Sequence, residues 1–140
     1  MIYIASPFFN PNQLDFVKLI EKALDEEGWE YYSPRSEGIL LDQTEEERQT
    51  NKKRIYDTNV EWIHKAEHMI AVIDDRDIGT IWEMGYAKAI GVNIVTISNQ
   101  SYGLNVMLAE SVQAHVLWIS DAIRALQDPT FKGELLKGLT

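Results

Sequence analysis

HMIAVIDDRDIGTIWEMGYAKAIGVNIVTIS, residues 68–98, is the stretch that decides the fold. It begins with an apolar run at residues 68–74 and ends with another at residues 93–98. Short runs that are apolar throughout are typical of strands buried on both faces. Residues 79–91 between them have helical character, and Gly91 is a typical residue after a helix end. The stretch therefore predicts a strand, a helix and a second strand parallel to the first.

The same alternation of strands and helices continues on both sides of this stretch. The remaining elements are expected as strands at residues 2–6, 29–34 and 114–120 and as helices at residues 11–28, 44–66, 103–111 and 121–139. Apolar strands that alternate with helices indicate a parallel sheet covered on both faces. With right-handed crossovers, the five strands fit an α/β fold of the flavodoxin-like, doubly wound type, in the order 2-1-3-4-5.

The position of a ligand site follows from this topology. In doubly wound sheets, ligands bind beyond the carboxyl ends of the strands, at the point where the strand order reverses. Here that crevice lies between the loop "SPFFN" at residues 6–10 and the loop "DDRDIGT" at residues 74–80. We therefore expect the functional residues at the ends of the first and third strands.

Composition limits the classes of protein that are possible. The 140 residues suit a single domain, 1–140, and contain no cysteine, which excludes a disulfide scaffold, a zinc ribbon and a thiol nucleophile. The net charge of −9 disfavours binding to nucleic acid polymers and to anionic membranes. No apolar run reaches the roughly eighteen residues of a membrane span, and "MIYIAS" does not resemble a signal peptide. We expect a cytoplasmic protein.

Glu83 is the residue whose role the local sequence leaves open. The segment TIWE, from Thr80 to Glu83, matches the capping-box pattern S/T-x-x-E, which satisfies free amides at a helix start. Thr44 and Glu47 have the same pattern, and there a cap is the simpler interpretation. Glu83 differs because its neighbours are aromatic and apolar, which desolvates a carboxylate and raises its reactivity. Carboxylates that converge in a cleft are the usual groups that cleave a glycosidic bond.

Three segments together resemble the nucleoside 2-deoxyribosyltransferase family. They are "IYIASPFFN" at residues 2–10, "DIGTIWEMGYA" at residues 77–87 and "GLNVM" at residues 103–107. The central segment is the most specific, with an aspartate followed by G-[TLV]-x-[WMF]-E-[LMV]-G-Y-A. The resemblance extends from residue 2 to about residue 107. It implies the flavodoxin-like fold that the strand pattern also predicts.

The resemblance implies an enzyme of nucleotide salvage that moves 2-deoxyribose from a 2′-deoxyribonucleoside to a free purine or pyrimidine base. Glu83 would attack C1′ and hold the sugar as a covalent ester, and a second displacement would retain the configuration at C1′. Asp77 would bind the base and transfer its proton. Tyr3 would orient the nucleophile. We expect no cofactor and no metal.

Several other residues match substrate-binding positions of this family. Phe8 would pack on the base, and Asn59 would contact it. Asn105 and Met107 match an N-x-M segment that reaches the sugar in a neighbouring subunit's site. That arrangement implies a homo-oligomer built from dimers, with a hexamer as one form.

Two weaker candidates are Ser6, for the sugar or a phosphate, and Asp75. Structural alternatives apply to all these residues: ordinary core packing for the apolar and aromatic ones, and capping or turn formation for the polar ones. Base preference stays open, because many members have aspartate where this chain has Asn59. Some members also place a glutamine near residues 36–38, where Glu37 is a candidate substitute.

A related activity is the alternative. An N-hydrolase of (deoxy)nucleoside 5′-monophosphates would use the same nucleophile with water as acceptor, and it would bind the phosphate through hydroxyl and basic groups. Ser6, Arg35 and Ser111 are candidates for that task. A receiver domain also has an aspartate where Asp74 lies, but the acidic pair and the lysine that it needs are missing. A flavin-binding module is disfavoured because the first loop lacks a glycine- and hydroxyl-rich phosphate cradle.

One motif is misleading. Residues 64–68 read H-x-x-E-H, which matches a zinc-protease signature that needs both histidines on one helical face. His68 leads directly into an apolar run, so we expect the helix to end between His64 and His68. The sequence therefore predicts no zinc site here.

Overall fold

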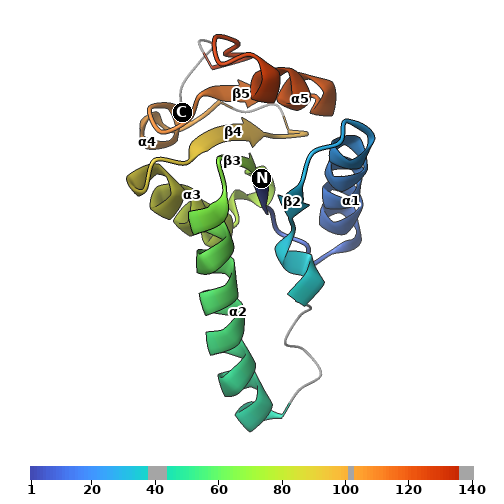
Figure 1. The fold of residues 1–140 in the computed structure, drawn as a ribbon, viewed down its shortest axis with the longest axis vertical. Coiled ribbons are helices and arrows are strands. Elements are labelled where there is room, and N and C mark those ends of the chain that lie inside the picture. Colours follow the sequence, from blue (N-terminus) through green and yellow to red (C-terminus); the bar gives the residue numbers. More distant parts are fainter. Residues whose placement is uncertain (38–43, 101–102, 136–140) are drawn as a thin grey trace.

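The computed structural model describes residues 1–37, 44–100 and 103–135. The described strands form one parallel sheet in the order β2-β1-β3-β4-β5, so the predicted order is confirmed (Figure 1). Hydrogen bonds join each pair of neighbours in parallel register. The strands are β1 (Ile2–Ala5), β2 (Tyr31–Tyr32), β3 (His68–Val72), β4 (Asn93–Ile97) and β5 (Ala114–Val116).

Helices cover both faces of the sheet, as the apolar strands predict. The helices are α1 (Pro11–Glu26), α2 (Glu45–Lys65), α3 (Ile78–Ala89), α4 (Val106–Ala109) and α5 (Ile119–Gln127), with 3-10 turns η1 (Pro34–Glu37) and η2 (Asp74–Arg76). α1 and α5 pack on one face, while α2, α3 and α4 pack on the other. The first turns of α2 extend away from the sheet (Figure 1).

The alternation of side chains along β1 decides which residue meets which helix. Ile2 and Ile4 point into the apolar cluster under α1 and α5, whereas Tyr3 and Ala5 point to the opposite cluster under α2 and α3. Tyr3 is fully buried there and pairs in register with Tyr32 of β2. β1 therefore presents a tyrosine, in a row of aliphatic residues, to the face that carries α3.

The C-terminal third corrects two predictions. The strand expected at residues 114–120 ends at Val116, because α5 begins at Ile119 and leaves Trp118 exposed before it. Apolar residues at helical spacing from Ile119 onward pack α5 on the core and override the strand-like composition. The closing helix expected at residues 121–139 ends at Gln127, because Pro129 forces the preceding residue into an extended conformation.

The helix expected at residues 103–111 is also shorter, since α4 is a single turn. Residues 136–139 of the expected closing helix lie outside the described residues. Among the described helices, none has the length and apolar character to cross a membrane.

Candidate active site

Glu83 and Tyr3 form the centre of the candidate site. Glu83 lies in the second turn of α3, and the Tyr3 hydroxyl donates a hydrogen bond to its Oε2. The tyrosine ring is fully buried in the middle of the sheet, so its hydroxyl has a fixed position. One oxygen of the carboxylate is therefore held, and within the described parts of the chain no hydrogen bond engages the other, Oε1.

The surroundings of Glu83 change its ionisation. Burial of the carboxylate raises the pKa of Glu83 to about 7, against a hydrogen bond from Tyr3 that lowers it, and the negative charge of Asp77 raises it further. Burial, followed by the charge of Glu83, also raises the pKa of Tyr3, so Tyr3 stays a hydroxyl donor. Near neutral pH, Glu83 is therefore present in both ionised and protonated forms, which suits a reacting group better than a structural one.

The start of α3 corrects the capping-box interpretation. The N-cap is Asp77, whose Oδ2 accepts hydrogen bonds from Thr80 N at 2.9 Å and from Thr80 Oγ1 at 3.0 Å. A Cβ on Gly79 would lie 3.3 Å from that oxygen, so glycine leaves room for the cap. Thr80 thus lies inside the helix instead of capping it. As a result, Glu83 takes no part in the helix start and its side chain points to Tyr3.

A cleft of about 550 Å³ opens beside Glu83, between α2 and α3. We call it the Glu83 cleft, and its walls include Tyr56, Asn59, Ile63, Trp82 and Glu83. Most of its lining is apolar or aromatic, with few polar groups, which is typical of a small-molecule site. Trp82 stacks on Tyr86 with ring centroids 5.4 Å apart, so one wall presents flat aromatic surface. Such a wall fits a planar ligand such as a nucleobase.

Tyr32 is a residue of the site that sequence reasoning missed. Its hydroxyl donates a hydrogen bond to Asn59 Oδ1 at 3.3 Å, and its ring stacks on Trp62 at 4.9 Å with 9° between the planes. The Tyr3 ring lies 5.8 Å from it on the neighbouring strand. The parallel register could have identified Tyr32. Once β1 and β2 are paired in this register, residue 32 lies on the same face of the sheet as Tyr3.

Three expected substrate-binding residues lie apart from Glu83. Phe8 packs against the apolar cluster under α1 and α5, on the opposite face of the sheet. The Ser6 hydroxyl is buried and donates to the Pro7 carbonyl at 2.9 Å. Asp75 lies in a polar pocket of about 450 Å³ beside α1, where Gln13 Nε2 donates to it at 2.9 Å. The described structure does not gather these residues around the Glu83 cleft.

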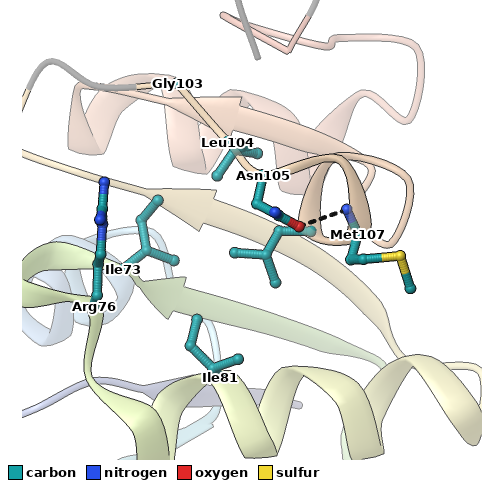
Figure 2. A pocket seen from close by; sticks show the side chains of 8 residues that line it. Ile73, Arg76, Ile81, Gly103, Leu104, Asn105 and Met107 are labelled. Carbon is teal, nitrogen blue, oxygen red and sulfur yellow. Dashed lines mark hydrogen bonds between the residues drawn. The ribbon is translucent and has the colours of Figure 1, made fainter. Parts of the chain in front are cut away.

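Asn105 and Met107 line a different pocket, of about 500 Å³, which Figure 2 shows. Asn105 Oδ1 accepts a hydrogen bond from Met107 N at 2.8 Å and so caps α4. Ile81 and Arg76 form other parts of that pocket, whereas Glu83 lines the cleft between α2 and α3. Met107 is 74% exposed. Within one chain, neither Asn105 nor Met107 lines the Glu83 cleft.

The loop between β3 and α3 has an uncommon backbone. Asp75 and Arg76 have φ angles of 59° and 51°, which is the left-handed region that favours glycine. The buried Asp74 before them accepts hydrogen bonds from Ser98 Oγ at 2.6 Å and Asn99 N at 3.2 Å, which anchors the loop to the end of β4. This tight turn sets where Asp77 begins α3.

The histidines of the zinc-like motif are separated as predicted. α2 ends at Lys65 and His68 begins β3, so the two histidines do not share a helical face. His64 contacts the Tyr86 hydroxyl at 2.5 Å instead. Within residues 1–37, 44–100 and 103–135, no group of three potential metal ligands lies together. Glu37, the candidate substitute near the base, lies outside the residues whose side chains are described.

Comparison with known proteins agrees with this architecture. The family model for nucleoside 2-deoxyribosyltransferase matches residues 2–115. A solved structure of the 2-deoxyribosyltransferase from Bacillus psychrosaccharolyticus is 29% identical, with a TM-score of 0.75 over 86% of this chain and 88% of that chain. A conserved protein from Enterococcus faecalis V583 is 17% identical, with a TM-score of 0.60 over 99% of this chain and 80% of that chain, and shares the fold. No curated protein matches. With most of its length matched, the chain belongs to the nucleoside 2-deoxyribosyltransferase family.

Proposed function

We propose that this protein transfers 2-deoxyribose from a 2′-deoxyribonucleoside to a free base through a covalent ester on Glu83, in cytoplasmic nucleotide salvage. The observation that carries the proposal is the half-buried Glu83 carboxylate, held by the Tyr3 hydroxyl at the edge of an aromatic cleft. A nucleophile of this kind needs a fixed direction and a partly desolvated charge. Both are present at Glu83.

The reaction proceeds in two displacements. Ionised Glu83 attacks C1′ through Oε1, the glycosidic C1′–N bond breaks, and its electron pair leaves with the base nitrogen, which takes up a proton. In the second step a nitrogen lone pair of the incoming base attacks C1′, the ester C1′–O bond breaks, and Glu83 regains its charge while the new base loses a proton. Two inversions give net retention at C1′.

In this proposal, Asp77 transfers the proton of the base. It caps α3 through Oδ2, and its charge is near enough to raise the pKa of Glu83. Its other oxygen, Oδ1, is the one that can meet the departing nitrogen. A carboxyl group in this position can deliver a proton to the first base and remove one from the second.

A neighbouring subunit completes the site in this proposal. Asn105 and Met107 line a separate pocket in their own chain, and the Met107 side chain is largely exposed. Both observations support their action on the Glu83 cleft of another copy. Mixing Glu83→Gln protein with Asn105→Ala protein then restores activity, because some mixed sites contain both native residues. If the mixture is no more active than its components after exchange of subunits, the site is not shared.

The substrate in this proposal carries no 5′-phosphate. The candidate phosphate ligands of the alternative hydrolase already have partners. Arg35 forms a bidentate ion pair with Glu21 of α1, in which Nε and Nη2 donate to the two carboxylate oxygens at 2.7 and 2.5 Å. Ser111 donates to the Met107 carbonyl at 2.6 Å, and the Ser6 hydroxyl is bonded to its own loop. The carboxylates of Asp77 and Glu83 would in addition repel a phosphate.

One assay tests the reaction and separates it from the alternative. Protein incubated with thymidine and adenine is expected to form deoxyadenosine and thymine, resolved by chromatography, and Glu83→Gln protein is expected to form neither. Quenching with acid in the absence of an acceptor base is expected to leave a deoxyribosyl group on the peptide that contains Glu83, seen by mass spectrometry. Free deoxyribose phosphate from a deoxynucleoside monophosphate, without base exchange, would instead identify the hydrolase.

A further inference from the structure

We propose that Asn59, oriented by Tyr32, makes the Glu83 cleft select bases with an oxo group over bases with an amino group at the position it meets. The inference rests on the proposed function and specifies its preferred bases. It assigns Tyr32 as a positioning residue that acts through Asn59. Neither residue takes part in the displacement at C1′.

Asn59 contributes a side-chain amide to the cleft wall. It lies in the second turn from the end of α2, and it lines the same cleft as Glu83. Because Glu83 must face the sugar carbon, the departing and incoming bases occupy the remainder of the cleft, between Trp82 on α3 and Asn59 on α2. The edge of a base in that position meets the Asn59 amide.

Tyr32 fixes which end of the amide meets the ligand. A tyrosine hydroxyl donates to Asn59 Oδ1 at 3.3 Å, so the carbonyl end of the amide is turned toward β2. Within the part of the chain that the structure describes, Asn59 Nδ2 has no hydrogen-bond partner. The free end of the amide therefore carries two N–H donors and no acceptor.

The tyrosine itself is immobilised. Its ring is stacked on Trp62 at 4.9 Å, faces the Tyr3 ring at 5.8 Å, and is only 9% exposed. Rotation of the Tyr32 ring would break both aromatic contacts. The orientation of Asn59 is thus imposed from the core of the sheet, through a residue that does not touch the substrate.

A fixed donor discriminates between bases by a simple rule. Hypoxanthine and adenine differ by an oxo or an amino group on the six-membered ring, and so do uracil and cytosine. An N–H donor can form a hydrogen bond with an oxo group, because the oxo oxygen is an acceptor. An amino group in the same place is also a donor, so no hydrogen bond forms between the two. In a partly desolvated cleft, this pair of facing donors lowers the binding free energy more than the mere loss of one contact does.

The test measures the ratio of kcat/KM for two competing bases, and a general loss of stability does not change this ratio. Wild-type protein is given deoxyribose from thymidine and equal amounts of hypoxanthine and adenine, or of uracil and cytosine, and kcat/KM is compared within each pair. We expect the oxo base to be favoured. Asn59→Asp replaces the donors by an acceptor and keeps the bond from Tyr32, so the ratio should move toward the amino base by about tenfold or more.

Tyr32→Phe tests the positioning role. The variant keeps the ring stack and removes the hydroxyl, so the amide can turn and the ratio of the two kcat/KM values should move toward one. Tyr31→Phe is the matched control, since the Tyr31 hydroxyl contacts Asp25 at 3.2 Å on the other side of the strand, and its ratio should stay at the wild-type value.

The outcomes separate this inference from the proposed function. A wild-type preference for the amino bases, or an unchanged ratio in Asn59→Asp, overturns the inference although transfer is intact. Absence of transfer to any base overturns the proposed function, and the inference with it. If Asn59→Asp does not fold, the ratio in Tyr32→Phe decides alone, and a wild-type ratio there contradicts the role of Tyr32.

Discussion

Two helix starts in this chain have the same four-residue pattern and use it differently. At the start of α2, Thr44 is the N-cap and its hydroxyl oxygen accepts a hydrogen bond from Glu47 N at 3.1 Å. At the start of α3, the threonine of the pattern is inside the helix, and Asp77 caps it three residues earlier. Glu47 is exposed, whereas Glu83 points to a buried tyrosine.

The difference shows that a second capping residue, three positions before the pattern, decides what the pattern does. A second capping group, Asp77, makes the glutamate of α3 unnecessary for the helix start. That glutamate then faces the sheet at a depth where burial raises its pKa to about 7. The same four-residue pattern thus forms a structural cap at the start of α2 and contains a candidate nucleophile at the start of α3.

The sharpest test of this contrast is to remove the charge from each glutamate in turn. Glu83→Gln is expected to lower kcat/KM for base exchange more than about a thousandfold, because it removes the nucleophile. Glu47→Gln, the matched control, is expected to leave kcat/KM near the wild-type value. Comparable losses in both variants would mean that the two residues have the same role.

Asp77→Asn separates the two tasks assigned to Asp77. Asparagine caps a helix about as well as aspartate, so the free energy of unfolding should change little. It cannot exchange a proton with the base, so kcat should fall by about a hundredfold. Denaturant unfolding together with steady-state kinetics checks both. Full activity in this variant would reduce Asp77 to a cap.

The raised pKa of Glu83 makes stability depend on pH. A carboxyl with a higher pKa in the folded state favours folding when protonated, and this contribution is lost as the pH rises through about 7. Relative to Glu83→Gln, wild-type protein should therefore lose about 2 kcal/mol of unfolding free energy between about pH 5 and about pH 8. Urea titrations at both pH values measure it, and parallel curves for the two proteins would contradict it.

Tyr3→Phe tests the hydrogen bond that holds Glu83. Glu83 attacks as the anion, so kcat/KM should rise with pH through its pKa. The bond from Tyr3 lowers that pKa, so its removal should shift the rising limb to higher pH and reduce activity at neutral pH by about tenfold. A pH–rate profile of both proteins checks the shift. A falling limb at about pH 7 would mean that Glu83 works as an acid.

The smallest expected effect is at the other helix start. Thr44→Ala removes the N-cap of α2 and should cost about 1 kcal/mol of unfolding free energy. Base exchange at a temperature where both proteins are folded should remain within about twofold, because Thr44 lies far along α2 from the cleft. A large loss of activity here would link the outer turns of α2 to the site.

The sequence predicted the sheet well, because the evidence for it is repeated in several strands. Several of the strands are largely apolar, and together they indicate a covered parallel sheet. The boundary between β5 and α5 was harder to predict. The segment around Trp118 has the composition of a strand, although an amphipathic helix begins there. Only the packing of Ile119 onto the core decides it.

Part of the geometry of the candidate site was predictable. A family motif or a helical face pointed to Glu83, Tyr3 and Asn59, and the structure places Tyr3 in contact with Glu83 and Asn59 on the wall of the same cleft. Tyr32 was missed because nothing in "WEYYSP" distinguishes it from Tyr31 until the strand register is known. Phe8 was expected at the base, and its position depends on which face of the sheet its loop packs against, which no local pattern encodes.

The hydrogen bond between Tyr3 and Glu83 joins residues 80 positions apart in the chain. It requires β1 to be paired with β3 and α3 to be packed on the sheet, so it is a strongly non-local contact. Contacts of this kind form slowly, because a long loop must close before they contribute to stability. During refolding, recovery of activity should therefore lag behind recovery of helix content. A kinetic trace of enzyme activity would report completion of the sheet more directly than circular dichroism.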